Sequence, residues 1–127
     1  MSALVLDAGA LIAVERGDRT MIARLEAAEQ GGTGLRSTAI VLAQVWRDPA
    51  GRQARLARLL RAVHIRAVDD QLARDAGVLL GRAGTTDPID ATVALVAEGG
   101  DQILTSDPDD LRHLVDTAGI HARVVAC

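Results

Sequence analysis

The sequence Ala3-Leu4-Val5-Leu6-Asp7-Ala8-Gly9 places an aspartate directly after a short apolar run. The run is continuous rather than periodic, which is typical of a buried strand, and Asp7-Ala8-Gly9 predicts a turn where that strand ends. A carboxylate is therefore expected at the C-terminal end of a strand.

Working outward from this run, short apolar stretches alternate with segments of helical periodicity. An arginine-rich helix is expected after Gly51, with Leu56, Leu59, Leu60 and Val63 on its apolar side. Alternation of this kind predicts an α/β fold with a mainly parallel sheet of four to five short strands, covered by helices on both faces. Further strands are expected at 34–38, 64–68, 102–105 and 122–126, and helices at 10–16, 18–30, 40–46, 69–82, 88–98 and from 108 onward.

Composition limits the chemistry available. A chain of 127 residues with 49% hydrophobic residues suits one domain, so we expect a single domain over 1–127. Cys127 is the only cysteine, which excludes an intramolecular disulfide and a cysteine-based zinc cluster and leaves oxygen atoms to hold any metal. All fourteen basic residues are arginine, which argues against phosphate-loop kinases and Schiff-base enzymes. With no signal peptide or membrane span in view, a soluble, cytoplasmic protein is expected.

Two segments, Asp87-Pro88-Ile89-Asp90 and Asp107-Pro108-Asp109-Asp110, repeat one pattern of acid, proline and a second acid. Helix initiation alone explains either segment, because an N-cap aspartate, a first-turn proline and a first-turn acid all favour a helix start. A functional explanation comes from convergence, since Asp7 and Asp107 would share one sheet edge if the first and fourth strands are neighbours. Crowded carboxylates repel one another unless protonated or joined by a cation such as Mg²⁺ or Mn²⁺.

These motifs together resemble a PIN-domain ribonuclease, specifically the VapC-type toxin of a toxin–antitoxin pair, over essentially the whole chain. The matching pieces are 4–11, Asp90-Ala91 with Ala94 and Ala97, and 103–107 with Asp110-Leu111. The resemblance implies a three-layer α/β/α fold and a metal-dependent endoribonuclease that uses Mg²⁺ or Mn²⁺. It also implies the catalytic acids Asp7, Asp90 and Asp107.

The same resemblance implies which side chains surround the metal. Asp7, Asp87, Asp90 and Asp107 are candidate ligands, and the choice between Asp87 and Asp90 as the direct ligand stays open. Candidates for the surrounding shell that orients ligands and waters are Gln44, Thr105, Ser106 and Asp110.

The chain departs from the family at Gln44, where a glutamate is usual. An amide oxygen can orient a water but adds no negative charge, so weaker metal affinity is expected. Two readings follow: an active nuclease, or a catalytically weak or inactive scaffold that binds RNA or a protein partner. Gln44 as an ordinary helix residue is a third explanation for that position alone.

Between Arg47 and Arg66 there are six arginines and one acid. An acidic cleft repels phosphate, so cations at its rim are expected to hold RNA, although arginines spread around a helix also suit a solvated face. The candidates are Arg47, Arg52, Arg55, Arg58 and Arg61. The resemblance further implies a homodimer and a small antitoxin whose C-terminal segment blocks the cleft, with the stretch 10–25 as the expected contact.

Overall fold

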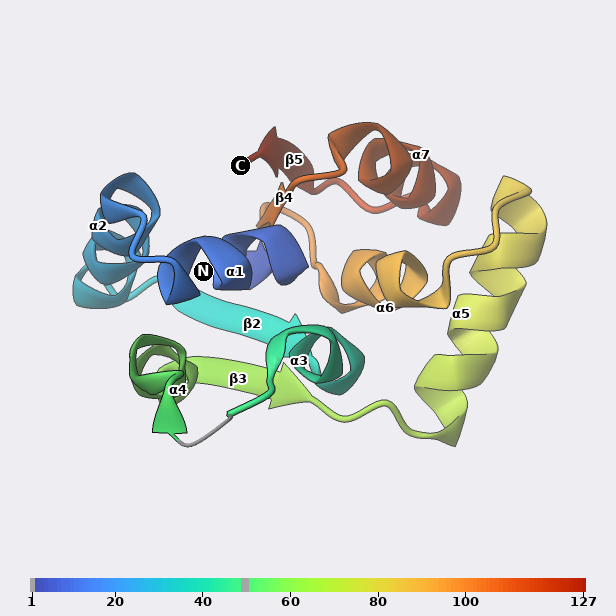
Figure 1. The fold of residues 1–127 in the computed structure, drawn as a ribbon. Helices are drawn as coiled ribbons and strands as arrows, with labels where there is room; N and C mark the ends of the chain where they lie inside the picture. Colours follow the sequence, from blue (N-terminus) through green and yellow to red (C-terminus); the bar gives the residue numbers. More distant parts are fainter. Residues whose placement is uncertain (1, 49–50) are drawn as a thin grey trace.

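The computed structural model describes residues 2–48 and 51–127 and contains one parallel sheet flanked by helices (Figure 1). The strands are β1 Ala3–Leu6, β2 Gly34–Thr38, β3 Val63–Arg66, β4 Gln102–Thr105 and β5 Arg123–Ala126. The helices of these residues are α1 Ala8–Glu15, α2 Arg19–Gln30, α3 Ala39–Val45, α4 Ala54–Leu60, α5 Asp70–Ala83, α6 Pro88–Val96 and α7 Pro108–Ala118.

The sheet has the order β3-β2-β1-β4-β5, and every neighbouring pair is parallel. Right-handed crossovers then place the helices between β1 and β3 on one face and the helices between β3 and β5 on the other. In agreement, α1 contacts α2, α3 and α4, whereas α6 contacts α5 and α7. The predicted α/β fold of three layers, with a mainly parallel sheet, is confirmed.

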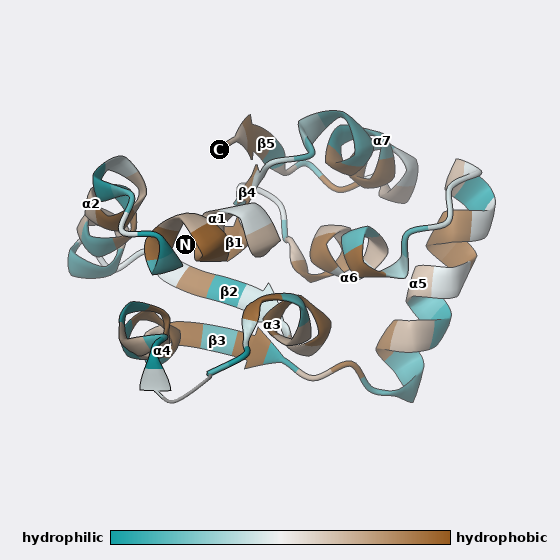
Figure 2. Ribbon diagram, in the orientation of Figure 1, coloured by the Kyte–Doolittle hydropathy of each residue, from teal (hydrophilic) through white to brown (hydrophobic). Residues whose placement is uncertain are grey.

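The central strands are the most deeply buried part of the sheet. Val5 and Leu6 of β1 and Ile103 and Leu104 of β4 are fully buried, because helices cover both faces there. In Figure 2 the strands β1 and β4 lie among mainly brown, apolar segments, while α5 alternates brown and teal as a surface helix does. The core therefore sits directly beneath the ends of β1 and β4.

Three sequence predictions about element ends were wrong. Ala8 and Gly9 form the first turn of α1 rather than a turn before it, because the carboxylate of Asp7 accepts from the backbone N–H of Ala8 and caps the helix. The strand expected at 64–68 is β3, which begins at Val63 and ends at Arg66, so Val63 does not lie on the apolar side of α4 although its spacing continues the helical period.

The third correction concerns α6, which ends at Val96 instead of Glu98. The chain turns there because the backbone N–H of Glu98 donates to Asp101 Oδ2 at 2.8 Å. Asp101 is 2% exposed and also accepts from the backbone N–H of Ala3 and from Arg36 Nη1, each at 2.8 Å. This buried carboxylate joins the N-terminal ends of β1 and β4 to the middle of β2.

A second buried polar side chain, Gln53, fixes the loop between α3 and α4. Its Oε1 accepts from the backbone N–H of Arg47 at 2.7 Å and from that of Asp48. Its Nε2 donates to Glu15 Oε1 at 2.6 Å and to the carbonyl of Val45 at 2.9 Å. The amide therefore ties this loop to the end of α1.

Within the described residues, no helix combines the length and the hydrophobicity that crossing a membrane requires.

Candidate functional site

Neighbouring strands β1 and β4 mark the point where the chain changes direction across the sheet. The chain leaves β1 towards β2 and leaves β4 towards β5, so the segments that follow these two strands separate to opposite faces. Ligands of open parallel sheets collect at such switch points, beyond the C-terminal ends of the strands. Asp7 follows β1 and Asp107 follows β4 after Ser106.

Three carboxylates meet at this edge. Ligand oxygens of Asp90, Asp107 and Asp110 all lie within 4.8 Å of one another. Asp90 stands in the first turn of α6 and is buried, while Asp107 and Asp110 stand at the start of α7 and are exposed. Contact between α6 and α7 brings acids from distant parts of the sequence together.

Asp7 is not a member of that group of three, but it is connected to it. Thr105 Oγ1 donates to Asp7 Oδ2 at 2.7 Å and accepts from the backbone N–H of Asp107 at 2.9 Å. The hydroxyl of Thr105 is fully buried, so both of its bonds are made in a protected environment. This hydroxyl links the residue after β1 to the start of α7.

The charges of these acids act on one another. The pKa of Asp90 is raised from 3.8 to about 7, first by burial and then by the negative charges of Asp87, Asp7, Asp107 and Asp110. The pKa of Asp107 is also raised, first by a side-chain hydrogen bond with Asp110 and then by burial and nearby negative charge. Asp7 contributes to both shifts, so it belongs to the same electrostatic cluster.

The donor set suits a hard divalent cation. Every candidate ligand atom is a carboxylate oxygen, which is the donor that Mg²⁺ and Mn²⁺ prefer. The pKa of Asp90 is raised first by burial and then by the negative charges of the neighbouring acids, and both effects disfavour its charged form. A bound cation favours the charged form of these carboxylates, and the residues present therefore fit a metal ion.

The simple explanation of the acids as helix caps holds for one segment and not for the other. Asp87 Oδ1 accepts from the backbone N–H of Ile89 at 2.9 Å and of Asp90 at 3.2 Å, so it caps α6. Asp107 occupies the corresponding position before α7 but makes no side-chain capping bond to that helix. Its carboxylate is therefore available for the cluster, and Asp90 rather than Asp87 is the partner from α6.

Gly9 allows the start of α1 to approach the loop after β4. A Cβ atom at Gly9 would lie 2.9 Å from Cβ and Oγ of Ser106 and 3.1 Å from its backbone nitrogen. Only glycine permits this approach without displacing the backbone beside Asp107. The glycine thus allows the first turn of α1 to pack against Ser106 at the site.

Other predicted residues lie outside the group of three. Gln44 is exposed on α3, the helix that follows β2. Arg47, Arg52 and Arg61 are exposed, and Arg47 Nη1 donates to the carbonyls of Ala43 and Trp46. Among the described residues, no hydrogen bond or ion pair joins these side chains to the three carboxylates.

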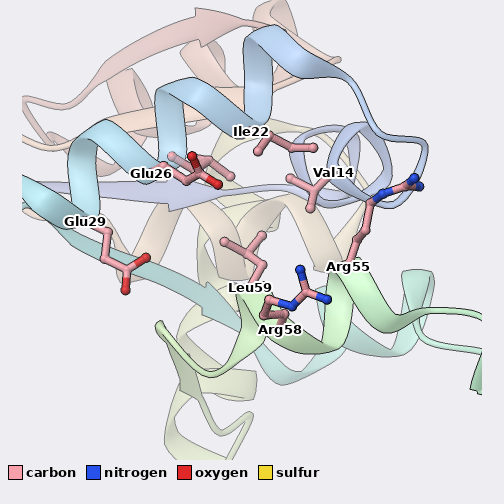
Figure 3. Close-up of a pocket in the computed structure, with 8 residues that line it drawn as sticks. Val14, Ile22, Glu26, Glu29, Arg55, Arg58 and Leu59 are labelled. Carbon is pink, nitrogen blue, oxygen red and sulfur yellow. The ribbon is translucent and has the colours of Figure 1, made fainter.

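Arg55 and Arg58 lie at the far end of α1 from Asp7. Arg55 Nη1 donates to the carbonyl of Glu15, the last residue of α1, at 3.3 Å. Both arginines face a pocket of about 300 Å³ between α2 and α4, across from two glutamates (Figure 3). The pocket is lined by Val14, Ile22, Leu25, Glu26, Glu29, Arg55, Arg58 and Leu59. These two arginines therefore flank a groove rather than the acidic cluster.

Buried hydroxyls beside the acids were not identified from the sequence. Ser37 Oγ donates to the carbonyl of Leu6, next to Asp7, at 2.7 Å. Thr38 and Thr92 are also buried and lie 3.2 Å apart through their Oγ1 atoms. The one signal for Thr38 is its place directly before a helix, where threonine is a favoured cap.

Comparison with known proteins supports the architecture. No protein-family model and no curated protein matches the sequence. A chain of the VapBC2 complex from Rickettsia felis, solved bound to a DNA fragment from its promoter, is similar with a TM-score of 0.69, 13% identity and coverage of 98% of both chains. A chain of DNA-bound VapBC from Salmonella typhimurium is similar with a TM-score of 0.68 and 20% identity, over 99% of this chain and 98% of that chain. The chain therefore has the PIN-domain fold that its sequence motifs predict.

Proposed function

We propose that this chain is a divalent-metal-dependent endoribonuclease, formed by a single domain over residues 1–127, and that it is the toxin of a toxin–antitoxin pair. The observation that carries the proposal is the group of Asp90, Asp107 and Asp110, whose oxygens lie within 4.8 Å at the switch point of the sheet. Similarity to chains of VapBC complexes supports the toxin–antitoxin assignment.

In this proposal Asp90, Asp107 and Asp110 hold Mg²⁺ or Mn²⁺, and Asp7 completes the negative charge of the site. A bound divalent ion supplies the positive charge that polarises a scissile phosphate and lowers the pKa of a bound water. Thr105 keeps Asp7 and the backbone of Asp107 in fixed relation, and Asp87 holds the start of α6. Ser106, exposed beside Asp107, is placed to contact substrate or solvent.

The direct test is cleavage of defined transfer and messenger RNAs with Mg²⁺ or Mn²⁺ and with EDTA. Asp107→Asn should abolish cleavage, since it removes a charged ligand. Asp109→Asn is the matched control, because Asp109 is exposed next to the site, pairs with Arg112 and lies outside the group of three. Cleavage that survives EDTA and the Asp107 substitution would contradict the proposal.

A catalytically weak scaffold remains the second candidate, and Gln44 is the residue that favours it. Restoring the carboxylate with Gln44→Glu separates the two functions. For a nuclease with weak metal affinity, the substitution should tighten Mn²⁺ binding and raise the cleavage rate. A catalytically weak or inactive scaffold should show no increase in cleavage after the change, and no Mn²⁺ binding at millimolar concentration.

The proposed antitoxin has a candidate binding surface in the groove between α2 and α4. Its floor is apolar, with Val14, Ile22 and Leu59, and its sides carry Glu26 and Glu29 opposite Arg55 and Arg58 (Figure 3). It includes side chains from the stretch 10–25, where a partner contact is expected. We propose that it binds an amphipathic segment bearing both signs of charge, and Arg58→Glu should weaken inhibition by the cognate antitoxin without loss of RNA cleavage.

We also propose that the chain forms a homodimer, which the resemblance implies. Ile40 and Val68 are each 38% exposed and line one apolar hollow beside the start of α6. Exposed apolar surface of this kind is typical of a contact between chains. Light scattering after gel filtration measures the molar mass, and Val68→Glu should shift it towards one copy if this surface forms the dimer.

A further inference from the structure

A chain of hydroxyl groups connects α3 to the first turn of α6. The backbone N–H of Val41 donates to Thr38 Oγ1 at 3.4 Å, and Thr38 Oγ1 lies 3.2 Å from Thr92 Oγ1. Thr92 Oγ1 donates to the carbonyl of Ile89 at 2.7 Å. Because Thr92 uses its single proton on that carbonyl, Thr38 must be the donor between the two hydroxyls. In all three hydrogen bonds the donor therefore lies on the α3 side and the acceptor on the α6 side.

The chain ends on the peptide group that carries Asp90. The oxygen of the Ile89–Asp90 peptide accepts from Thr92, and the nitrogen of the same peptide donates to Asp87 Oδ1 at 3.2 Å. Both polar atoms of this peptide are therefore held by side chains. The peptide also lies within the backbone hydrogen bonding of α6, and these two side-chain bonds add to it in holding the peptide from which the Asp90 side chain leaves the helix.

Both hydroxyl groups in this series of hydrogen bonds are buried. Thr38 is 0% exposed and Thr92 is 3% exposed, so neither hydroxyl can exchange its partner for water. Valine would fill the same volume at either position without a polar atom. Thr38 is the last residue of β2, so the bond between the hydroxyls ties α6 to the edge of the sheet where the acids gather.

We propose that Thr92, held by Thr38, is a positioning residue that sets the place of the Asp90 carboxylate for metal binding. The inference rests on the proposed function, because it concerns the metal site assigned there. Partners that orient a metal ligand typically change metal affinity by about 10–100-fold when they are removed. Thr92 acts indirectly, through its hydrogen bond to the Ile89–Asp90 peptide, and contacts neither metal nor substrate.

Binding of Mn²⁺ to the RNA-free protein, measured by electron paramagnetic resonance of the unbound ion, tests the proposal without reference to cleavage. Thr92→Val should raise the Mn²⁺ dissociation constant by about tenfold, and Thr92→Ser should restore it to within about twofold of wild type. Thr117→Val is the matched control, because Thr117 Oγ1 makes the same kind of bond, to the carbonyl of His113 at 2.8 Å, on the exposed side of α7. The control should leave Mn²⁺ affinity unchanged.

Two further variants separate positioning from stability. In an Asp90→Asn background, Thr92→Val should cause no additional loss of Mn²⁺ affinity, since its effect passes through Asp90. The double variant Thr38→Val/Thr92→Val leaves neither hydroxyl without a partner but removes the cap on the backbone N–H of Val41, and it is the second test of the role if Thr92→Val alone does not fold. Its Mn²⁺ dissociation constant should rise by at least the same factor.

The outcomes are distinct. A folded Thr92→Val or double variant with unchanged Mn²⁺ affinity, or an equal further loss in the Asp90→Asn background, overturns the positioning role alone. Wild-type protein that binds no Mn²⁺ overturns the proposed function instead. Circular dichroism at the temperature of the titration shows which variants are folded.

Discussion

Thr105 Oγ1 donates to Asp7 Oδ2 at 2.7 Å across the neighbouring strands β1 and β4. The same hydroxyl accepts from the backbone N–H of Asp107, so Thr105→Val leaves a partly buried donor and the buried carboxylate of Asp7 without these partners. We expect the free energy of unfolding to fall by about 1–3 kcal/mol. Urea denaturation measures it, and Thr105→Ser, which keeps the hydroxyl, should lose much less. Equal stability of the valine variant and wild type would show that these bonds contribute nothing net.

The raised pKa of Asp90 predicts how stability depends on pH in the absence of metal. Folded protein retains the Asp90 proton up to about pH 7, whereas the unfolded chain releases it near 3.8. Since the folded state binds more protons between these values, the free energy of unfolding should fall as pH rises from about 4 to 7. Asp90→Asn removes this contribution, so its melting temperature relative to wild type should increase across the same range.

Thermal scans by circular dichroism in EDTA, from acid to neutral pH, measure that difference. Asp109→Asn serves as the control, because Asp109 is exposed and contributes to neither raised pKa. Addition of Mn²⁺ at neutral pH should raise the melting temperature of wild type and not of Asp90→Asn. A difference in melting temperature between Asp90→Asn and wild type that stays constant at every pH would contradict the raised pKa of Asp90.

Gly9→Ala should disturb the site through backbone contact. The new Cβ would lie 2.9 Å from the Ser106 side chain and 3.1 Å from its backbone nitrogen, so the loop beside Asp107 must move. We expect a loss of about 1–3 kcal/mol in unfolding free energy, together with weaker Mn²⁺ binding. Gly81→Ala is the control in α5, where a Cβ meets nothing within 4 Å, and it should gain up to about 1 kcal/mol. A Gly9 variant as stable as the Gly81 variant would contradict the close approach.

Gln53→Leu should loosen the connection between α3 and α4. The substitution removes the amide oxygen that accepts from Arg47 and the amide nitrogen that donates to Val45 and Glu15. It leaves the backbone groups of Arg47 and Val45 without these partners. We expect a loss of about 2–3 kcal/mol in unfolding free energy. Gln71→Leu, on the exposed surface of α5, removes one hydrogen bond to Asp75 and should change stability by less than about 0.5 kcal/mol. Similar losses in both variants would mean that the buried amide has no special role.

The fold could be predicted because short strands, of which β1 and β4 are mainly apolar, alternate with segments of helical periodicity. The predicted ranges for β2 and β4 match the structure, with Gly34 at the start of β2 and Asp101 directly before β4. Val63 was assigned wrongly because its spacing from Leu56 and Leu60 satisfies a helical period, and only pairing with Leu35 of β2 shows that it is a strand residue. Periodicity alone cannot distinguish these cases.

The site could be predicted only in part, because its acids share one local pattern. Asp87 and Asp107 both precede a proline at a helix start, yet Asp87 caps its helix and Asp107 makes no side-chain capping bond. Asp110, expected in the surrounding shell, lies within the group of three because of where α7 meets α6. The hydroxyls of Thr38 and Thr92 are 54 residues apart, so no local pattern identifies their contact.

The last strand brings the only cysteine of the chain to the same edge as the acids. The backbone N–H of Cys127 donates to the carbonyl of Thr105 at 2.9 Å, and partial burial, followed by the negative charge of Asp7, raises the pKa of the Cys127 thiol. A nitroxide or fluorophore attached there, at a pH high enough to form the thiolate, would report paramagnetic Mn²⁺ through space. Occupancy of the acidic cluster could thus be followed spectroscopically in the unmutated sequence, with no engineered labelling site.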